Sequence, residues 1–346
     1  IEMKYRVLHV VRRFGPVGGM ERYVWRLTSE LLELGMEVDI LCQSVECDVD
    51  PRITIHLLEP STDRRRWKAM RDFRDKCNQF WLKFKAKDDV IVHSHERCSF
   101  HNVTTFHGSP MPRWSDMPWY KKISPRIHAW MQFEREEVCR DRVKAIVPVS
   151  SLVSAGLEAS YAEALAYLAK PGWPGLDLYE VKENKGAGGR ILFVGREWKR
   201  KGLDIALEAF SRVQLSDPSV KMDVFGLPCS EIPKSLRRGL KDVTFFDWQS
   251  NIPYEHYDVL LHPARFEPFG MIVPEARAAG LSVVTSEQVG ALDLDLGSVE
   301  VVKIRDESVS WATALEEALK KPKPPTELKW TWSQLAQWYI AKIYSR

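Results

Sequence analysis

Two glutamates eight positions apart, Glu267 and Glu275, are the side chains of this 346-residue sequence best suited to chemistry on a small polar ligand. An apolar run at 257–262 predicts a buried strand, and Gly270 is expected to open a helix that carries Glu275. The N–H groups at such a helix start attract phosphate. Two carboxylates beside a phosphate must bind something else, and sugar and ribose hydroxyls fit, because one carboxylate accepts from two neighbouring hydroxyls.

The elements that must position these residues alternate between strands and helices along the chain. Strands are predicted at 5–11, 37–43, 90–93, 103–106, 145–149, 190–194, 221–225, 243–246, 257–262 and 281–285, and helices at 20–34, 202–213, 270–279 and 333–344. This alternation predicts an α/β fold with parallel sheets, whose ligands bind at the carboxyl ends of the strands. The Pro- and Gly-rich stretch 170–175 predicts a domain boundary near residue 172.

Several motifs, spread over nearly the whole chain, resemble those of retaining glycosyltransferases with the GT-B fold, and of glycosyltransferase family 4 in particular. They are Gly18-Gly19-Met20-Glu21, Phe106-His107-Gly108, Pro174-Gly175-Leu176-Asp177, the strand and loop 191–202 with Arg196 and Lys201, the spacing of Glu267 and Glu275, and the aromatic helix that starts at Trp330-Thr331-Trp332-Ser333. The resemblance implies two doubly wound Rossmann-like domains that face each other across a cleft. Residues 1–172, with a returning helix at 332–346, would form the acceptor side, and residues 173–331 would bind the nucleotide-sugar.

The resemblance also implies a role for each matched residue. Arg196 and Lys201 would contact the donor diphosphate, and their two positive charges against about two negative ones remove much of the need for a metal. Glu275 would bind the ribose, Glu267 the transferred sugar, and His107 would lie against that sugar near the reacting carbon. The implied catalytic residues are His107 and Glu267, and the implied donor-binding residues are Gly18, Gly19, Arg196, Lys201, Phe269, Gly270, Met271 and Glu275, with no metal ligand.

The function implied by the resemblance is transfer of a hexose-type sugar from a nucleoside-diphosphate-sugar, preferably a UDP-sugar, to a glycan or glycolipid. Transfer would retain the anomeric configuration, the departing phosphate oxygen would take the acceptor proton, and no cofactor beyond the donor is expected. The setting implied is bacterial lipopolysaccharide or surface polysaccharide synthesis. The alternative is a GT-B protein that binds a nucleotide-sugar without transferring it, although the complete residue set argues against this.

Two other groups of residues resemble metal sites. His93, His95, Glu96 and His101 have a spacing that does not put three ligands on one face of a helix, so we expect no metal there. Asp293-Leu294-Asp295 imitates the metal-binding D-x-D of another glycosyltransferase fold, but it lies in a late loop, so a solvated acidic turn is expected.

The segment 64–87 contains ten Lys or Arg residues and two acids, with aromatic residues at helical spacing. One interpretation is a domain helix with a buried stripe and a solvated basic face. The other is contact with anionic lipid or with a phosphorylated glycolipid acceptor. A nucleic-acid partner is not expected, because the sequence contains no recognisable module for one and its pI is only 8.4.

The bulk composition bears on where the protein works. The sequence has no apolar run long enough to span a membrane, and it starts directly with a strand-like run, so we expect neither a transmembrane helix nor a signal peptide. Six cysteines without a C-x-x-C pair favour a reducing compartment. We therefore expect a cytoplasmic protein, bound peripherally to the inner face of the cell membrane if segment 64–87 meets lipid.

Overall fold

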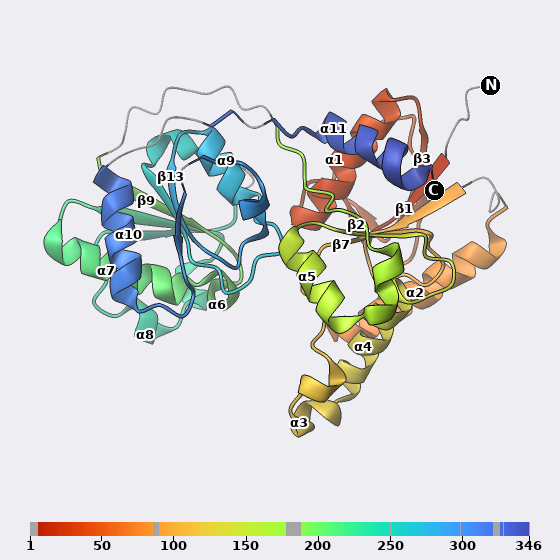
Figure 1. The fold of residues 1–346 in the computed structure, drawn as a ribbon, viewed down its shortest axis with the longest axis horizontal. Coiled ribbons are helices and arrows are strands. Elements are labelled where there is room, and N and C mark those ends of the chain that lie inside the picture. The colour runs from red at the N-terminus through yellow and green to blue at the C-terminus, as the bar shows by residue number, and fades with distance from the viewer. Residues whose placement is uncertain are drawn as a thin grey trace. The chain divides into compact units, whose positions relative to one another are not determined.

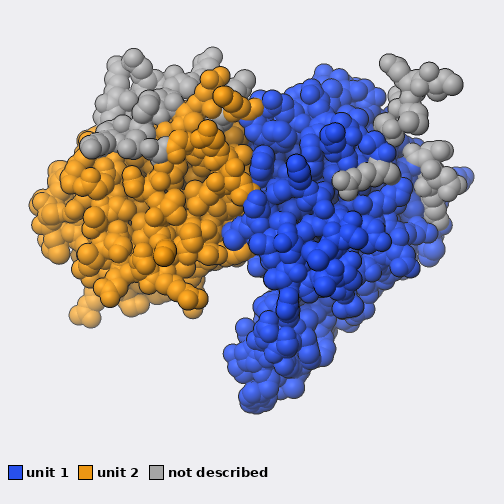
Figure 2. Space-filling model, in the orientation of Figure 1, with its two compact units in different colours: residues 1–175, 330–346 blue, residues 176–329 orange. Residues whose placement is uncertain are grey.

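The computed structural model describes residues 6–85, 90–177, 188–249, 251–297, 299–320, 326–327 and 329–345. The chain forms two compact units, unit 1 with Ile1–Gly175 and Trp330–Arg346, and unit 2 with Leu176–Lys329 (Figure 2). The first boundary lies three residues after the predicted one, and the second lies two residues before it. Tyr5 and Lys87 of the predicted strand and basic segment lie outside the described residues.

Unit 1 is built on a six-stranded sheet in the order β5-β3-β1-β6-β7-β8, and all of its pairings are parallel. The strands are β1 (Arg6–Val10), β3 (Glu37–Cys42), β5 (Thr54–Leu57), β6 (Val90–Ser94), β7 (Val103–Phe106) and β8 (Ala145–Pro148), and a small two-stranded ladder joins β2 (Arg13–Phe14) to β4 (Ser44–Val45). The central strands are near-continuous buried runs, as expected for strands covered by helices on both faces. In β1 every residue from Val7 to Val10 is buried.

The helices of unit 1 are α1 (Gly19–Glu33), α2 (Arg66–Lys83), α3 (Trp119–Lys122), α4 (Pro125–Val138), α5 (Ser151–Ser160) and α11 (Trp332–Tyr339), which continues as a π-helical turn (Ile340–Tyr344) (Figure 1). Helix α1 buries Leu27 and Leu31 on one face and ends before Gly35, whose φ of 82° suits glycine. Helix α11 starts at a capping box formed by Thr331 and Gln334, and it packs on α1.

Gly175 lies where the chain leaves unit 1. A Cβ there would collide with the backbone of Thr331 and Trp332, where the chain returns. Only glycine allows this close approach of two backbone segments. The glycine of the predicted interdomain motif therefore has a packing role inside unit 1.

Unit 2 repeats the architecture with a parallel sheet in the order β11-β10-β9-β12-β13-β14. Its strands are β9 (Arg190–Val194), β10 (Lys221–Phe225), β11 (Val243–Phe246), β12 (Val259–His262), β13 (Ser282–Ser286) and β14 (Glu300–Val302), and its helices are α6 (Trp198–Lys201), α7 (Leu203–Ser216), α8 (Lys234–Arg237), α9 (Ile272–Ala278) and α10 (Ser308–Lys320). Helices α7 and α10 pack against each other over a core that contains Phe193, Phe210 and Trp311 (Figure 1).

Both sheets have the strand order of a doubly wound fold, so the predicted fold class is confirmed. The order reverses between β1 and β6 in unit 1 and between β9 and β12 in unit 2. At such a switch point the loops after the two strands diverge and leave room for a ligand at the carboxyl ends. None of the described helices is long and apolar enough to cross a membrane.

Two predicted helix boundaries were wrong, and in both cases a glycine explains why. Gly270 does not open a helix, because its φ is 87°, and α9 begins two residues later at Ile272. Gly202 has a φ of 75° and separates α6 from α7, which begins at Leu203. Helix α7 also ends at Ser216 rather than at Val213, and this end does not depend on Gly202. A positive φ lies outside the right-handed helical region, so these glycines interrupt the helices.

Candidate functional site

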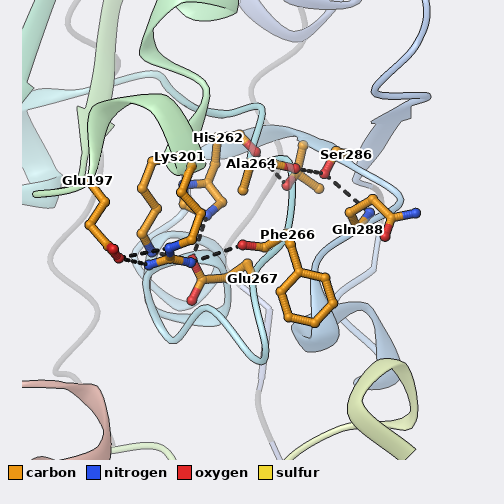
Figure 3. A network of polar contacts seen from close by, with 10 residues as sticks. Glu197, Lys201, His262, Ala264, Phe266, Glu267, Ser286 and Gln288 are labelled. Carbon is orange, nitrogen blue, oxygen red and sulfur yellow. Dashed lines mark hydrogen bonds and ion pairs between the residues drawn. The ribbon is translucent and has the colours of Figure 1, made fainter. Parts of the chain in front are cut away.

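The switch point of unit 2 brings together residues from the loops after β9 and β12. The carboxylate of Glu267 pairs with the ammonium of Lys201, and Nη1 of Arg200 lies 3.1 Å from its Oε2 (Figure 3). The buried ring of His262, the last residue of β12, places Nε2 3.9 Å from the same oxygen. Predicted residues Lys201 and Glu267 therefore lie together, and Arg200 and His262 are contributors that sequence reasoning missed.

The electrostatics of this group keep Glu267 ionised. Burial by itself raises the pKa of Glu267, but the nearby charges of Lys201 and Arg200 outweigh it and hold the pKa below its ordinary value. Burial, assisted by Lys201, lowers the pKa of His262 to about 3, so this ring is neutral. Glu267 is thus a carboxylate that can only accept hydrogen bonds, from hydroxyls as well as from its cations.

The backbone around Glu267 is held on both sides. Its N–H donates to the carbonyl of Gln288 at 2.8 Å, and its carbonyl accepts from the N–H of Gly290 at 3.0 Å. A Cβ at Gly270 would lie 2.8 Å from Cγ of Glu267, and one at Gly202 would collide with the carbonyl oxygen of Pro263. Both glycines are therefore required for the two loops to close around the ion group.

Glu275 occupies a different place in unit 2. It lies in α9, is buried, and accepts a hydrogen bond from the hydroxyl of Tyr254 at 2.7 Å. Phe269 is buried and Met271 is half-buried between the two glutamates. Helix α9 has only seven residues, and Pro274 in its first turn has no backbone N–H. The start of this helix therefore offers a phosphate fewer N–H groups than predicted.

Arg196, the other predicted phosphate ligand, does not join the Glu267 group. It is exposed, and its guanidinium lies 4.1 Å from the ring centroid of Trp248. The loop 196–201, whose second part is the single helical turn α6, carries four cationic side chains and one carboxylate. Even after Glu267 is counted, a net positive charge of two remains. This loop can attract an anion such as a diphosphate.

In unit 1 the predicted glycine loop precedes α1. Gly18 is the N-cap of α1, with an extended φ of −164°, and a Cβ there would meet the carboxylate of Glu21. That carboxylate is held by Arg13 at 2.6 Å. A Cβ at Gly19 would meet no atom within 4 Å, so nothing in the described chain demands glycine there. Packing of the fold does not explain the glycine at position 19, whereas the close approach of a ligand would explain it.

His107 follows β7 and belongs to a cluster of histidines at the switch point of unit 1. His9 is the penultimate residue of β1 and His93 that of β6, the register pairs these two residues, and His95 directly follows β6. Nδ1 of His9 lies 3.0 Å from Nε2 of His95, and Nδ1 of His95 lies 3.0 Å from Nε2 of His107. Burial lowers the pKa of all four rings, to about 3 for His9 and His107.

The same cluster continues through hydroxyl groups to the C-terminal helix. The hydroxyl of Tyr339 contacts that of Tyr23 at 2.9 Å and Oγ1 of Thr105 at 2.6 Å. Nε2 of His93 lies 2.7 Å from Oγ1 of Thr105, and Nδ1 of His93 lies 2.7 Å from the hydroxyl of Tyr344. The returning helix is therefore hydrogen-bonded to the centre of the unit 1 sheet.

His9, His93 and His95 place one possible ligand atom each within 4.8 Å of one another, a grouping that could hold a metal ion. The sequence argument against a metal considered only spacing along one helix. It overlooked that neighbouring parallel strands bring distant histidines to one edge. Most of the ring nitrogens are nevertheless used in hydrogen bonds, since both nitrogens of His93 face hydroxyls and His9 contacts His95 directly. Among the described residues, Nε2 of His9 has no such partner.

A buried ion group holds the loop after His107. Arg97 pairs with Glu134 at 2.9 Å and with Glu137, and its guanidinium lies 4.6 Å from the ring centroid of Phe106. Glu134 also accepts from the backbone N–H of Met111 at 2.7 Å. Sequence reasoning missed this group, although two glutamates three residues apart beside buried Phe133 in α4 are a signal for it.

The described part of segment 64–87 contains features of both interpretations. Helix α2 buries Met70, Phe73 and Cys77, as the structural interpretation expects. Arg74 is buried as well, paired with Glu136 and lying over Phe133 at 4.4 Å. The remaining exposed basic residues of the segment are Arg64, Arg65, Arg66, Arg71, Lys83 and Lys85.

The sequence is similar to those of known glycosyltransferases. The family model described as Glycosyltransferase Family 4 matches residues 17–161, and the model described as Glycosyl transferases group 1 matches residues 188–321. A D-inositol 3-phosphate glycosyltransferase of Geodermatophilus obscurus is 24% identical over 332 residues, which cover 80% of this chain and 72% of that protein.

Solved structures agree at the level of the fold. WaaG, a glycosyltransferase involved in lipopolysaccharide biosynthesis, superimposes with a TM-score of 0.74 and 19% identity over 97% of this chain and 95% of its own. Sucrose-phosphate synthase from Thermosynechococcus elongatus gives a TM-score of 0.73 and 16% identity over 99% and 98%. Anabaena HepE, in complex with UDP and glucose, gives 0.70 and 15% over 98% and 99%.

Two parallel doubly wound units with this likeness define the GT-B fold. The family models identify the protein with this fold as a glycosyltransferase. The two family models match residues 17–161 and 188–321, and they confirm the resemblance to glycosyltransferase family 4 that the motifs predicted.

Proposed function

We propose that the protein transfers a hexose-type sugar from a nucleoside-diphosphate-sugar, with a UDP-sugar as the preferred donor, to a glycan or glycolipid with retention of configuration. The observation that carries the proposal is the Glu267 group at the switch point of unit 2. A buried carboxylate kept ionised by two cations, beside a loop with net positive charge, suits a ligand that combines hydroxyls with a diphosphate. The complex of HepE with UDP and glucose supports this donor class.

The proposed division of labour follows from these contacts. Arg196 and the cations of the 196–201 loop bind the diphosphate and stabilise the charge that develops as it leaves. Glu267 accepts from hydroxyls of the transferred sugar, and its position is fixed in advance by Lys201 and by its backbone bonds. Glu275 accepts from the ribose hydroxyls as it accepts from Tyr254.

The acceptor proton goes to the departing phosphate oxygen in this proposal, so no protein base is needed. His107 fits a binding role, because burial lowers its pKa to about 3 and keeps the ring neutral. We also propose that no metal is required, since the cationic loop supplies the positive charge. Transfer should therefore persist in EDTA, whereas complete loss that Mg²⁺ restores would contradict metal independence.

The two glutamates test the proposal. Glu275→Gln should weaken binding of UDP and of the UDP-sugar alike, while its amide oxygen still accepts from Tyr254. Glu267→Gln should reduce turnover but leave UDP affinity unchanged or raised, because Lys201 and Arg200 lose their counter-charge. Losing a hydrogen bond to a charged group costs about 1.5–3 kcal/mol, or roughly 10- to 150-fold.

Calorimetry with UDP and kinetics with the donor measure both effects, and Glu255→Gln, in the turn beside Tyr254, is the matched control. Equal loss of UDP affinity in both variants would refute the division of labour. No effect in either variant would refute the proposed donor site, and donor binding without any transfer would favour the alternative of a binding protein.

For the acceptor we propose a lipid-linked or surface glycan, met by unit 1 at the inner face of the cell membrane. The WaaG likeness supports this setting. Besides the basic residues of α2, unit 1 exposes Trp119 at 75% and Ile123 at 72% around α3, next to Lys121 and Lys122. Exposed apolar side chains beside basic ones are typical of surfaces that meet lipid.

Vesicle binding at low salt tests the membrane part. Changing Arg64, Arg65 and Arg66 to Gln should weaken binding to anionic vesicles by about 1 kcal/mol per residue, in a salt-sensitive way. The same change at Lys221, Lys303 and Arg305, exposed residues of unit 2, should have little effect. A wild-type protein that ignores anionic vesicles would leave α2 with its structural role alone.

A further inference from the structure

Three histidine rings of unit 1 form a hydrogen-bonded row, called the histidine file below, that starts in the buried sheet. Nδ1 of His9 contacts Nε2 of His95, and Nδ1 of His95 contacts Nε2 of His107, each at 3.0 Å. His9 is fully buried, His95 is 4% exposed, and His107 is half-buried. The file therefore ends at Nε2 of His9 in the buried sheet and at Nδ1 of His107 in a ring that is half-buried.

The number of protons in the file is fixed. Burial lowers the pKa of all three rings, so each is neutral near pH 7 and carries one N–H. Each of the two contacts needs one N–H that donates to a bare nitrogen. The third proton therefore lies either on Nε2 of His9 or on Nδ1 of His107, and all three rings exchange tautomers together.

The surroundings of the two ends decide between them. Nε2 of His9 is buried and has no hydrogen-bond partner in the described part of the chain. A buried N–H without an acceptor is costly and rare, so a proton there is unfavourable. At the half-buried end, an N–H on Nδ1 of His107 can donate to water or to a ligand.

We propose that His9 and His95 are positioning residues that hold His107 as the Nδ1–H tautomer, so that it presents a hydrogen-bond donor to an oxygen of the transferred sugar. The identity of that oxygen rests on the proposed function, whereas the tautomer does not. In this state Nδ1 of His107 cannot accept a proton, so His107 binds a sugar oxygen and is not the base of the reaction.

Nuclear magnetic resonance of the histidine rings tests the tautomer directly. The full-length protein, labelled with ¹⁵N-histidine and treated with EDTA, is measured at pH 7.5 by two-bond ¹⁵N–¹H correlation, and single His→Asn variants assign the signals. All three rings should be protonated at Nδ1 and bare at Nε2. This pattern is informative because the Nε2–H form predominates for histidine in water. A His107 ring protonated at Nε2 overturns the proposal.

Two variants of the middle ring test the cause. His95→Phe removes the N–H that faces Nε2 of His107, so His107 should shift toward the Nε2–H form. His95→Asn can still offer an amide N–H and should preserve the Nδ1–H form. His128→Phe, an exposed histidine bonded to the carbonyl of Lys122, is the control and should change nothing. A His107 tautomer unchanged in His95→Phe overturns the proposal, and if that variant does not fold, the wild-type and His95→Asn spectra decide.

Binding of UDP and UDP-glucose separates this proposal from the proposed function. His95→Phe should weaken UDP-glucose roughly tenfold, the cost of one hydrogen bond, and leave UDP unchanged. His95→Asn should bind UDP-glucose with nearly the wild-type affinity. Equal weakening of both ligands overturns the assigned contact with the sugar. If the wild-type protein binds neither ligand, the proposed donor class is refuted, while the spectra still decide the tautomer.

Discussion

The two switch points have the same strand order but opposite chemistry. In unit 2 the carboxyl edge gathers charges, with Glu267 ionised between Lys201 and Arg200. In unit 1 the corresponding edge gathers neutral rings and hydroxyls, with His9, His95 and their neighbours linked by hydrogen bonds. Charges suit a diphosphate and a polyhydroxyl ligand, whereas a neutral buried network fixes the directions of its donors and acceptors. The doubly wound fold prescribes the place of a site, and the side chains at the strand ends decide its physics.

Acid should have the largest effect and should destabilise unit 1 more than unit 2, because most of the neutral histidine rings lie in unit 1. A histidine whose pKa is lowered in the fold is protonated first in the unfolded chain. The unfolded state then binds more protons between the two pKa values, so stability is complete above about pH 6.5 and falls as the pH decreases. In unit 2 the pKa is lowered for His262. In unit 1 it is lowered for five described histidines, which are His9, His93, His95, His101 and His107.

Each of these rings lowers the free energy of unfolding by up to about 1.4 kcal/mol for every pH unit below 6.5. Glu96, whose pKa is raised to about 7 by burial, acts in the opposite direction in unit 1 but cannot offset five histidines. From pH 7.5 to 5.5 unit 1 should lose several kcal/mol and unit 2 about 1.4 kcal/mol. Hydrogen–deuterium exchange, corrected for the intrinsic effect of pH, measures each unit separately. Loss of protection first in unit 2 would contradict the expectation.

The second prediction concerns the charged edge. Lys201→Met leaves Glu267 with Arg200 as its remaining close cation, and breaking a buried pair costs about 3–5 kcal/mol when nothing compensates. Since Arg200 compensates in part, we expect a loss of about 2–3 kcal/mol in denaturant unfolding of unit 2 at pH 7.5. The control Lys199→Met, at an exposed position of the same loop, should stay within about 0.5 kcal/mol.

The double variant Lys201→Met with Glu267→Gln sharpens this test. It removes the stranded charge, so it should be more stable than Lys201→Met alone. If the double variant is less stable by the sum of the two single losses, the two side chains do not act as a pair.

How much of each edge could be predicted from sequence follows from the range of its contacts. Glu267 and Glu275 are eight residues apart on one strand, loop and helix, so a local pattern reveals them. The pair of Lys201 and Glu267 spans 66 residues, and the contact of His9 with His95 spans 86. Such contacts depend on which strands become neighbours, and the apolar pattern of a strand does not encode its neighbour.

Element prediction failed for a related reason. The central strands are continuous apolar runs and were predicted, as was the edge strand β11, whose sequence is apolar although none of its residues is buried. The two edge strands that were not predicted are β5, which has no buried residue, and β14, which buries only Val302. A strand that is half exposed gives a weaker hydrophobic signal than its central neighbours. The positive φ of Gly202 and of Gly270, which moved two helix starts, likewise depends on the tertiary contacts around them.

The smallest predicted effect is that of removing one hydroxyl group from the neutral edge of unit 1. Tyr339→Phe removes the hydroxyl that joins Tyr23 and Thr105, but Tyr23 keeps its bond to the carbonyl of Gly172 at 3.0 Å and Thr105 keeps His93. Because the partners remain bonded, we expect a loss of about 1 kcal/mol in thermal or urea unfolding. Tyr120→Phe, at an exposed tyrosine, is the control and should be neutral.

A loss near 3 kcal/mol for Tyr339→Phe would mean that the hydroxyls act as one cooperative chain, in which removing a member strands the others. The neutral edge would then respond to a deletion as the charged edge does to Lys201→Met, where a group is left buried without its partner. A loss near 1 kcal/mol would instead show that redundancy is what distinguishes the neutral edge. Tyr23 and Thr105 each have a second partner there, whereas the Glu267 carboxylate needs its cations to remain ionised in a buried position.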